Sequence, residues 1–431
     1  MKKKILIALG VIVFIILLFI GFEYIQFLNA TKRMEELSRD LEQRITEWEK
    51  KEYKRPPLFG PAILCNAAEY YQQAESQMKE LLKDSGVWIQ WADYVYDYKP
   101  LSTTGISYYE KAKPIIELVK LGNKMELYKS PLNIRDGFRC NFPNLLSPRH
   151  IADVMIIQGR GLEKDNQYSD ALQLYCEVIR FGDSYLYYGT LIPSMINILV
   201  SEIGYEEIRR VILTNKLSED DLNKLISYLK TLFNPESFYE NIWDTEELLT
   251  EAGLIQYAKT AGFLPKKNDF GWGKKLWANR TDYVNVVNDM KIVYREIKTI
   301  YNVPYDLPGV LEYFQHRIKA VKNPISQTLI PNDILSAKIC YFKHRAQRRG
   351  LYILCALEIY KARHQKYPEK LSDLTPEIIK DVPLDPFSDQ PFIYKIDQDQ
   401  KILLYSVGDN LKDDNGDEKH YNDIVIAPLK K

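Results

Sequence analysis

The sequence predicts a mainly α-helical protein with an N-terminal transmembrane helix, a helical body and a small C-terminal α+β module. Three observations support this prediction. An apolar run follows a lysine-rich start, apolar residues recur at spacings of three and four through most of the chain, and residues 391–427 contain short apolar runs separated by turn-forming residues. We therefore divide the chain into an anchor (1–22), a stalk helix (23–57), a helical body (58–331) and the α+β module (332–431).

The anchor begins with Met1-Lys2-Lys3-Lys4, and the uncharged run from Ile5 to Phe22 is near the minimum length for a membrane-spanning helix. By the positive-inside rule, the lysines remain in the cytoplasm and the rest of the chain is exported. This predicts a membrane protein whose main domain lies outside the cytoplasm. A cleaved signal peptide is the alternative, but residues 21–24 offer no pair of small residues at a cleavage-site spacing. We therefore favour an uncleaved anchor that spans the membrane once.

The overall charge is balanced, with 58 basic and 58 acidic residues. A net charge of zero gives no general attraction to nucleic acid, so nucleic acid is not an expected partner. A basic cluster at residues 343–349 is expected to pair with the acidic helix around residues 236–251 or to face solvent.

The stalk is predicted to be an amphipathic helix that ends before Pro56-Pro57. Its apolar stripe consists of Met34, Leu37, Leu41, Ile45 and Trp48. This stripe can pack on the body or pair with a second copy of the chain, and packing on the body is the expectation.

The body contains a predicted helical hairpin. Ser147-Pro148 provides a capping residue and a first-turn proline for a helix that runs to about Leu162, and a second helix follows from Tyr168 to Phe181. The pair resembles one tetratricopeptide unit, with Gly159 and Ala171 where that motif needs small residues. No second copy occurs in register, so the sequence predicts a repeat-like hairpin rather than a solenoid.

Three runs near the C-terminus resemble a known family. Tyr367-Pro368 ends a long helix that begins near Asp333, Asp385-Pro386-Phe387 precedes Pro391-Phe392-Ile393-Tyr394, and Leu404-Tyr405-Ser406-Val407-Gly408 precedes an acidic loop. This order resembles the C-terminal domain of the major pseudopilin of type II secretion, with one extra residue between Phe387 and Pro391. The resemblance implies one helix laid across a small antiparallel sheet, with strands at 391–396, 402–406 and 424–427.

The chain also departs from the pseudopilin pattern. A pseudopilin helix continues directly from the membrane segment, and its start carries a prepilin cleavage site followed by a glutamate. Here the body separates anchor and helix, and Lys4-Ile5-Leu6-Ile7 lacks that signature. Assembly into a filament is therefore not expected. The whole chain resembles membrane-anchored envelope proteins of bacteria. This resemblance implies a location in the bacterial inner membrane with a periplasmic main domain, but it supplies no activity.

The acidic loop is the candidate metal site. Its oxygen-bearing residues are Asp409, Asp413, Asp414, Asn415, Asp417 and Asp423. Calcium prefers six to eight such oxygen ligands. The EF-hand pattern fails because Glu418 stands where that motif needs glycine. The pseudopilin resemblance implies calcium binding, with Asp414, Asp417 and Asp423 as the nearest counterparts of the family's ligands. The alternative is a solvated turn formed by Asn415-Gly416.

The five cysteines show no Cys-x-x-Cys motif and no metal-ligand spacing with histidine. Cys176 and Cys355 lie inside apolar helical patterns and are predicted to be buried thiols. Cys65 and Cys140 lie in turn-like surroundings, and export would allow them to form a disulfide.

Catalytic patterns are sparse. Ser76 and Ser227 each begin a Ser-x-x-Lys match within an ordinary amphipathic helix, and HExxH, GxSxG and P-loop motifs are absent from the sequence. The five histidines are scattered beside charged residues and are expected on the surface. Glu246, Glu247 and Glu251 near Trp243 could form the carboxylate pair of a glycosidase, although an acidic helix face is the commoner explanation.

These observations favour a membrane-anchored extracytoplasmic binding or scaffold protein of the bacterial envelope, linked to secretion or pilus-like machinery. The alternative is an envelope hydrolase that acts on polysaccharide or peptidoglycan through carboxylates of the acidic helix. The sequence gives no firm basis for assigning an enzymatic activity.

Overall fold

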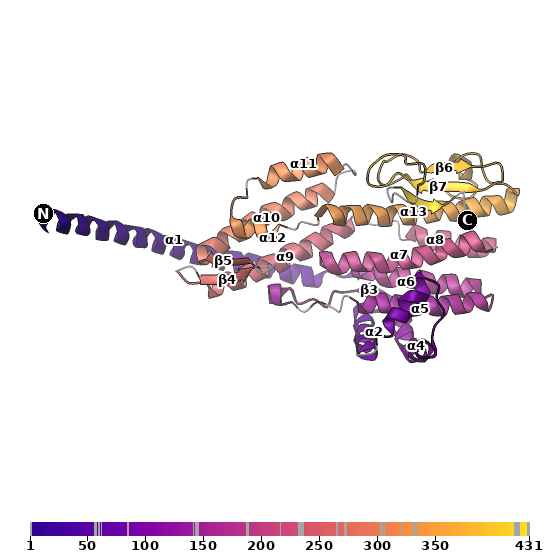
Figure 1. Ribbon diagram of the computed structural model, residues 1–431, viewed down its shortest axis with the longest axis horizontal. Coiled ribbons are helices and arrows are strands. Elements are labelled where there is room, and N and C mark those ends of the chain that lie inside the picture. Colours follow the sequence, from indigo (N-terminus) through magenta and orange to yellow (C-terminus); the bar gives the residue numbers. More distant parts are fainter. Residues whose placement is uncertain are drawn as a thin grey trace.

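The protein is elongated, with the N-terminal helix projecting from one end and the C-terminal sheet near the other (Figure 1). The computed structural model describes all of the chain except residues 1, 56–57, 59–60, 62, 84–85, 141, 143–145, 187–188, 216, 232–236, 264–265, 271–273, 302–304, 306, 320, 331–333, 418–422 and 429–431. Within the described residues helices predominate, as the sequence predicts.

The helices are α1 (Lys2–Lys50), α2 (Ala67–Leu82), α3 (Trp88–Tyr96), α4 (Thr103–Lys124), η1 (Ile134–Arg139), α5 (Ser147–Lys164), α6 (Tyr168–Leu186), α7 (Leu191–Thr214), α8 (Glu219–Thr231), α9 (Ser237–Thr260), α10 (Arg280–Tyr301), α11 (Leu307–Ile318), α12 (Pro324–Leu329), α13 (Ile334–His364) and η2 (Leu371–Leu374). The strands are β1 (Tyr53–Lys54), β2 (Ile63–Asn66), β3 (Met125–Tyr128), β4 (Lys266–Phe270), β5 (Lys274–Ala278), β6 (Ile393–Ile396), β7 (Ile402–Ser406) and β8 (Ile424–Ala427).

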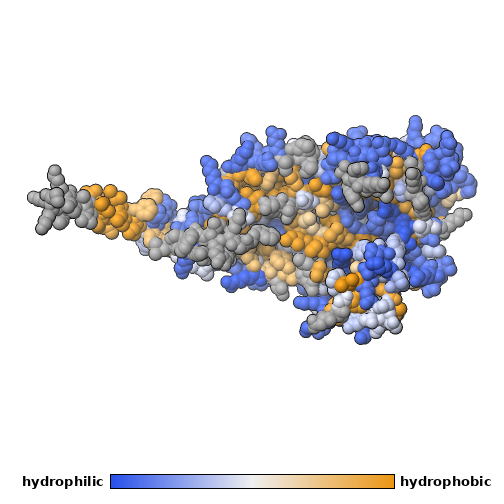
Figure 2. Space-filling model, viewed as in Figure 1, coloured by the Kyte–Doolittle hydropathy of each residue, from blue (hydrophilic) through white to orange (hydrophobic). Residues whose placement is uncertain are grey.

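Helix α1 joins the predicted anchor and stalk without a break and ends at Lys50, several residues before the predicted end of the stalk. At 1.5 Å per residue it is roughly 70 Å long. Of the described helices, α1 alone is long and apolar enough to cross a membrane, and its apolar section is not buried in the protein. Figure 2 shows this hydrophobic section projecting beyond the body. The location of an apolar helix at the N-terminus agrees with the predicted anchor.

The second half of α1 packs on α9 and α10. Its buried residues are Ala30, Met34, Leu41, Ile45 and Trp48, which include most of the predicted apolar stripe. The Trp48 indole N–H donates to Thr245 Oγ1 at 3.1 Å. The expectation that the stalk packs on the body is therefore confirmed.

A seam of ion pairs surrounds this apolar contact. Arg44 of α1 contacts Glu247 at 3.1 Å and Glu251 at 2.6 Å, both on α9. Lys291 of α10 contacts Asp40 of α1 at 3.0 Å. Because Glu251 is buried and the apolar stripe lies beneath, the seam fixes the direction in which α1 leaves the body.

The hairpin predicted at residues 147–181 is present as α5 and α6. A Cβ added to Gly159 would lie 2.3 Å from Tyr175 Cε1, so only glycine allows α5 and α6 to cross this closely. Ala171 is fully buried at the same contact layer. Helix α7 then packs against both, and a Cβ on Gly204 would meet Ile179 Cγ1 at 2.6 Å. The tetratricopeptide likeness of this hairpin stays a prediction.

The C-terminal module contains the predicted antiparallel sheet, in the order β6-β7-β8. Helix α13 contacts β7 and β8, and a Cβ added to Gly350 would lie 2.4 Å from Ile426 Cγ1. Helix α13 also contacts α7 and α8 of the helical body. One helix therefore belongs to both the body and the module, and the two share a continuous core.

A buried polar cluster joins α13 to α6 and α7. Arg348 donates to Asp183 Oδ2 at 2.7 Å and to the Tyr205 hydroxyl at 2.7 Å, and Ser201 Oγ donates to Asp183 Oδ1 at 2.8 Å. Burial alone would raise the pKa of the Asp183 carboxyl, but Arg348 and His344 hold it below its usual value. The surface location expected for His344 is wrong, since this residue is buried. Arg348 pairs with Asp183 of α6 and is buried, so for this residue both expectations, pairing with the acidic helix and exposure to solvent, are wrong.

Two further sheets were not predicted. In the first, β3 lies between β1, which is antiparallel to it, and β2, which is parallel to it. In the second, β4 and β5 form an antiparallel hairpin. The strands are only two to five residues long, and their sequences lack an extended alternation of apolar and polar residues.

Candidate functional site

A cavity of about 540 Å³ lies between the C-terminal end of α3, the N-terminal end of α5 and one face of α7. Its volume falls within the range of about 300–1,000 Å³ that is typical of small-molecule sites. We call it the α3–α5–α7 pocket. The sequence analysis did not identify it, because its lining residues are distributed over three helices.

Helix α7 forms the apolar wall. Ile196, Leu199, Val200 and Ile203 line the pocket at spacings of three and four, so they share one face of the helix. Leu199 is 56% exposed although it is apolar, and Leu146 at the start of α5 is 62% exposed. Two exposed leucines at the mouth of an apolar cavity indicate a surface that a ligand or partner can cover.

The opposite wall is aromatic. Tyr96 ends α3 and Tyr98 follows it in a left-handed conformation, with φ of 56°. The Tyr96 hydroxyl donates to Asp153 Oδ1 at 3.3 Å, and the Arg149 guanidinium lies 5.2 Å from the centre of the Tyr96 ring. Burial raises the pKa of the Tyr96 hydroxyl, so it remains a neutral hydrogen-bonding group. The Arg160 guanidinium lies 4.5 Å from the centre of the Tyr98 ring, so both rings of this wall carry a cation.

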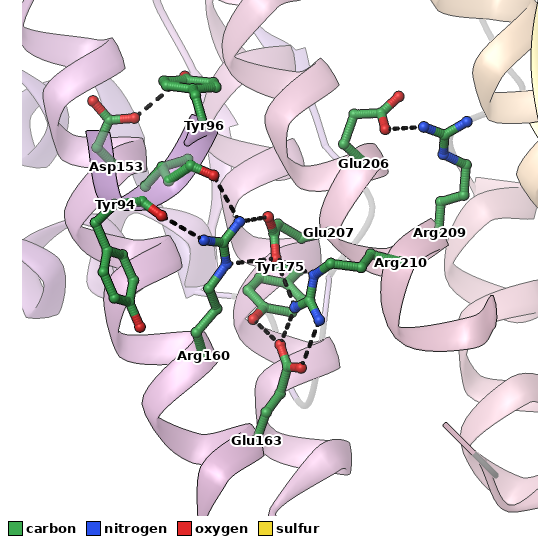
Figure 3. A network of polar contacts seen from close by, with 11 residues as sticks. Tyr94, Tyr96, Asp153, Arg160, Glu163, Tyr175, Glu206, Glu207, Arg209 and Arg210 are labelled. Atoms are coloured by element: carbon green, nitrogen blue, oxygen red, sulfur yellow. Dashed lines mark hydrogen bonds and ion pairs between the residues drawn. The ribbon is translucent and has the colours of Figure 1, made fainter. Parts of the chain in front are cut away.

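A chain of buried ion pairs reaches the pocket at Glu207 (Figure 3). Arg160 of α5 contacts Glu207 of α7 with two nitrogens, and its other bonds go to the carbonyl oxygens of Tyr94 and Val95, both at 2.8 Å. These two oxygens belong to the last turn of α3, where free carbonyls attract a cation. Arg160 therefore ties α3, α5 and α7 together and sets the width of the pocket.

Arg210 extends the chain. It contacts Glu207 at 2.7 Å and also Glu163, whose carboxylate accepts a hydrogen bond from the Tyr175 hydroxyl. Glu207 is thus flanked by two guanidinium groups, and its charge is neutralised. Glu206, the next residue, is exposed and pairs with Arg209 on the other side (Figure 3).

Glu202 is the lining carboxylate with no hydrogen bond or ion pair to any residue that the structure describes. It is half-buried between the pocket and α13. Burial, and secondarily Glu206, raises the pKa of Glu202 to about 7, while nearby Lys343 acts in the opposite direction. An apolar cavity that contains one uncompensated carboxylate can bind a molecule with an apolar body and a polar end.

The structure brings only some residues of the predicted metal site close to one another. Asp413 Oδ1 accepts hydrogen bonds from the Tyr405 hydroxyl at 2.6 Å and the Asn415 N–H at 2.8 Å, and Asp414 accepts one from Asn410. Asn415 and Gly416 both have positive φ, as expected for the Asn-Gly turn. Asp409 lies close to Tyr305, which donates to its carbonyl oxygen at 3.1 Å.

The surroundings of Asp423 favour cation binding more than those of the other residues of the predicted metal site. Its Oδ2 accepts from the Gly416 N–H at 2.8 Å, while its Oδ1 is buried without a partner among the described residues. Burial raises the pKa of the Asp423 carboxyl, and Asp414 and Asp413 raise it further. However, the described residues contain no group of three metal-ligating side chains, and residues 418–422 of the loop lie outside them. Calcium binding by this loop, including the role of Asp417, therefore stays a prediction.

Asp385 explains why two of the motif runs occur together. Its carboxylate accepts hydrogen bonds from the Phe387 N–H at 3.0 Å, the Ser406 hydroxyl at 2.9 Å and the Val407 N–H at 3.0 Å. The Asp-Pro-Phe run and the Tyr-Ser-Val-Gly run thus meet at one buried acid. The role of these motifs within this chain is structural, because Asp385 is 1% exposed.

All five cysteines are free thiols in the structure. Cys176 and Cys355 are buried, as predicted. Cys65 is exposed on β2 and Cys140 is buried after η1, so the suggested bridge between them stays a prediction.

The carboxylates proposed for a hydrolase have structural partners. Glu247 and Glu251 pair with Arg44 in the α1 seam, and Glu246 accepts the Leu191 N–H at 2.6 Å. Ser76 and Ser227 lie on exposed faces of α2 and α8. Ser201, His344 and Asp183 have the composition of a catalytic triad, but serine and histidine both contact Asp183 Oδ1, whereas a triad needs the histidine in between.

Comparison with protein-family models gave no match, and neither the curated proteins nor the solved structures gave a significant one.

Proposed function

We propose that this chain is a membrane-anchored, extracytoplasmic binding or scaffold protein of the bacterial envelope, and that its ligand occupies the α3–α5–α7 pocket. The observation that carries the proposal is the pocket itself: apolar walls, exposed leucines at its mouth and an uncompensated carboxylate. Such a combination is typical of binding sites.

The structure of α1 supports the membrane location in this proposal. The apolar section of α1 continues as one helix into a half that is packed on α9 and α10 and held by ion pairs. A membrane-inserted α1 would therefore hold the body at a fixed distance and orientation from the bilayer. The three lysines before the apolar run support a cytoplasmic N-terminus.

A link to secretion or pilus-like machinery rests on the C-terminal module. Helix α13 lies against a three-stranded antiparallel sheet, and Asp385 joins the two motif runs that resemble those of the major pseudopilin. In this proposal the module is a docking unit for an envelope partner, whereas the pocket binds a smaller ligand.

Location is tested with the full chain expressed in a Gram-negative host. Cys65 is exposed, so Cys65→Ser gives the parent, and Lys401→Cys adds an exposed thiol on the C-terminal module. We expect a membrane-impermeant maleimide to label the Lys401→Cys variant in intact spheroplasts, and the protein to resist carbonate extraction with an unprocessed N-terminus. Labelling only after lysis would refute the topology, and a processed, carbonate-soluble protein would refute the anchor.

A further inference from the structure

We propose that the α3–α5–α7 pocket selects a small hydrophobic cation, an organic amine with an apolar body, and that the carboxylate of Glu202 binds the ammonium group. This inference rests on the proposed function, in that it takes the pocket to be a ligand site. It adds the charge and chemical class of the ligand.

The first step is to count the charges that face the pocket. Of the three lining carboxylates, Glu207 is held between Arg160 and Arg210, and Glu206 is paired with Arg209. Neither has a net charge to offer a ligand. Glu202 has no such partner in the described part of the chain, so its charge is available.

The second step concerns the competing charges around Glu202. Lys343 of α13 acts on its carboxyl electrostatically but makes no ion pair within 4.0 Å in the described structure, and Cys340 of α13 lies on the same side. Arg149 is the lining cation, and it lies over the Tyr96 ring on the opposite wall. A ligand ammonium is therefore the remaining way to compensate Glu202 in the pocket.

The third step concerns the rest of the ligand. Ile196, Leu199, Val200 and Ile203 present an apolar surface beside Glu202 on the same helix. Burying an apolar body there releases water from exposed side chains. The rings of Tyr96 and Tyr98 already carry the guanidinium groups of Arg149 and Arg160, so they add apolar surface to the pocket. A carboxylate ligand of the same shape would instead be repelled by the uncompensated charge of Glu202.

The test uses three probes that share one apolar body and differ in charge: 4-phenylbutylamine, 4-phenylbutan-1-ol and 4-phenylbutyrate. Their affinities are measured by calorimetry at pH 8 with the full chain in lipid nanodiscs, and empty nanodiscs serve as the blank. We expect the amine to bind about tenfold more tightly than the alcohol, which corresponds to about 1.4 kcal/mol, and the carboxylate to bind most weakly.

Glu202→Gln should reduce the amine's affinity to that of the alcohol, because it removes the charge and keeps the shape. Glu206→Gln is the matched control: the same change one turn along α7, on a carboxylate that already has a cation. This control should change the affinity for the amine by less than about threefold, as expected for the removal of a screened, compensated charge.

The outcomes separate the inference from the function on which it rests. If all three probes bind with similar affinity, or if Glu202→Gln leaves the preference for the amine unchanged, the inference is wrong and the pocket remains a binding site. If the carboxylate binds most tightly, Arg149 selects the ligand and the inference is wrong. If none of the probes binds, the pocket is not a ligand site and both proposals fail.

Discussion

Glu207 is the carboxylate partner of Arg160, the residue that joins the three helices of the pocket, so its replacement by glutamine is the most informative perturbation of the fold. Glutamine preserves the shape and one acceptor but removes the charge that Arg160 and Arg210 share. Arg210 retains Glu163, whereas Arg160 would be left without a carboxylate. The side chains of Arg160 and Glu207 are only 9% and 6% exposed, so solvent cannot replace the lost partner.

The expected cost follows from this burial. Removing one partner of a buried ion pair leaves an uncompensated charge and typically costs about 3–5 kcal/mol. Glu206→Gln is the control on the neighbouring residue, because its pair with Arg209 is exposed, with 47% of the glutamate side chain accessible. Breaking an exposed pair costs about 0–1 kcal/mol.

Both variants are measured by urea unfolding of the full chain in dodecyl maltoside, followed by tryptophan fluorescence. Trp91 reports directly on α3, since it is fully buried and donates to the Gly105 carbonyl oxygen at 3.2 Å. We expect Glu207→Gln to lower the free energy of unfolding by at least about 2 kcal/mol more than Glu206→Gln. Equal effects of the two substitutions would refute the role assigned to the Arg160–Glu207 pair.

Three further predictions concern pH and calcium. Amine affinity should rise about fivefold from pH 6 to pH 8. Burial and Glu206 raise the pKa of Glu202 to about 7, so about a tenth of this carboxyl is ionised at pH 6 and about nine tenths at pH 8, and the tenfold preference for the amine belongs to the ionised form. The charged or titratable neighbours of Glu202 are Lys343, Cys340 and Arg149. Calorimetry at several pH values checks this prediction, and an affinity that does not change with pH contradicts it. Burial raises the pKa of Glu75 to about 8, so the folded protein retains a proton that the unfolded chain loses near pH 4.5, and stability should fall as pH rises from about 5 to 8, by up to about 1.4 kcal/mol per pH unit. Glu75→Gln should therefore become increasingly more stable than the parent over that interval, and a difference in unfolding free energy that is independent of pH would show that Glu75 is ionised in the fold. Calcium should raise the melting temperature of the protein. Asp423→Asn should abolish this rise, because Asp423 Oδ1 is buried without a partner in the described structure. A melting temperature that does not change with calcium would show that the loop is a turn and not a calcium site.

Local sequence patterns predicted the elements that depend on them. The apolar run and stripe of α1, the α5–α6 hairpin and the three short C-terminal strands all come from periodicity, caps and turn residues that are contiguous in the chain. The antiparallel arrangement of those strands was implied by the pseudopilin resemblance. Gly159 is a clear case, because the prediction of a small residue at a close helix crossing matches its contact with Tyr175.

The pocket could not be predicted in this way. Its ion pair joins Arg160 and Glu207, which lie 47 residues apart, and nothing local specifies that they meet. The available signal was a charged residue on an otherwise apolar helix face, which requires a buried partner. The same signal at Arg348 was interpreted as a surface cluster, and Asp183 on a distant helix turned out to be its partner.

The most direct test of the account is whether blocking the pocket blocks binding. Leu199→Trp places a large side chain at the mouth of the pocket, whereas Ile192→Trp makes a comparable change at a similarly exposed position on α7 that does not line it; the two residues are 56% and 59% exposed. With 4-phenylbutan-1-ol as a neutral probe, the account predicts that Leu199→Trp abolishes calorimetric binding and that Ile192→Trp leaves it unchanged. Binding that is the same in the parent and both variants would show that the ligand occupies another part of the molecule.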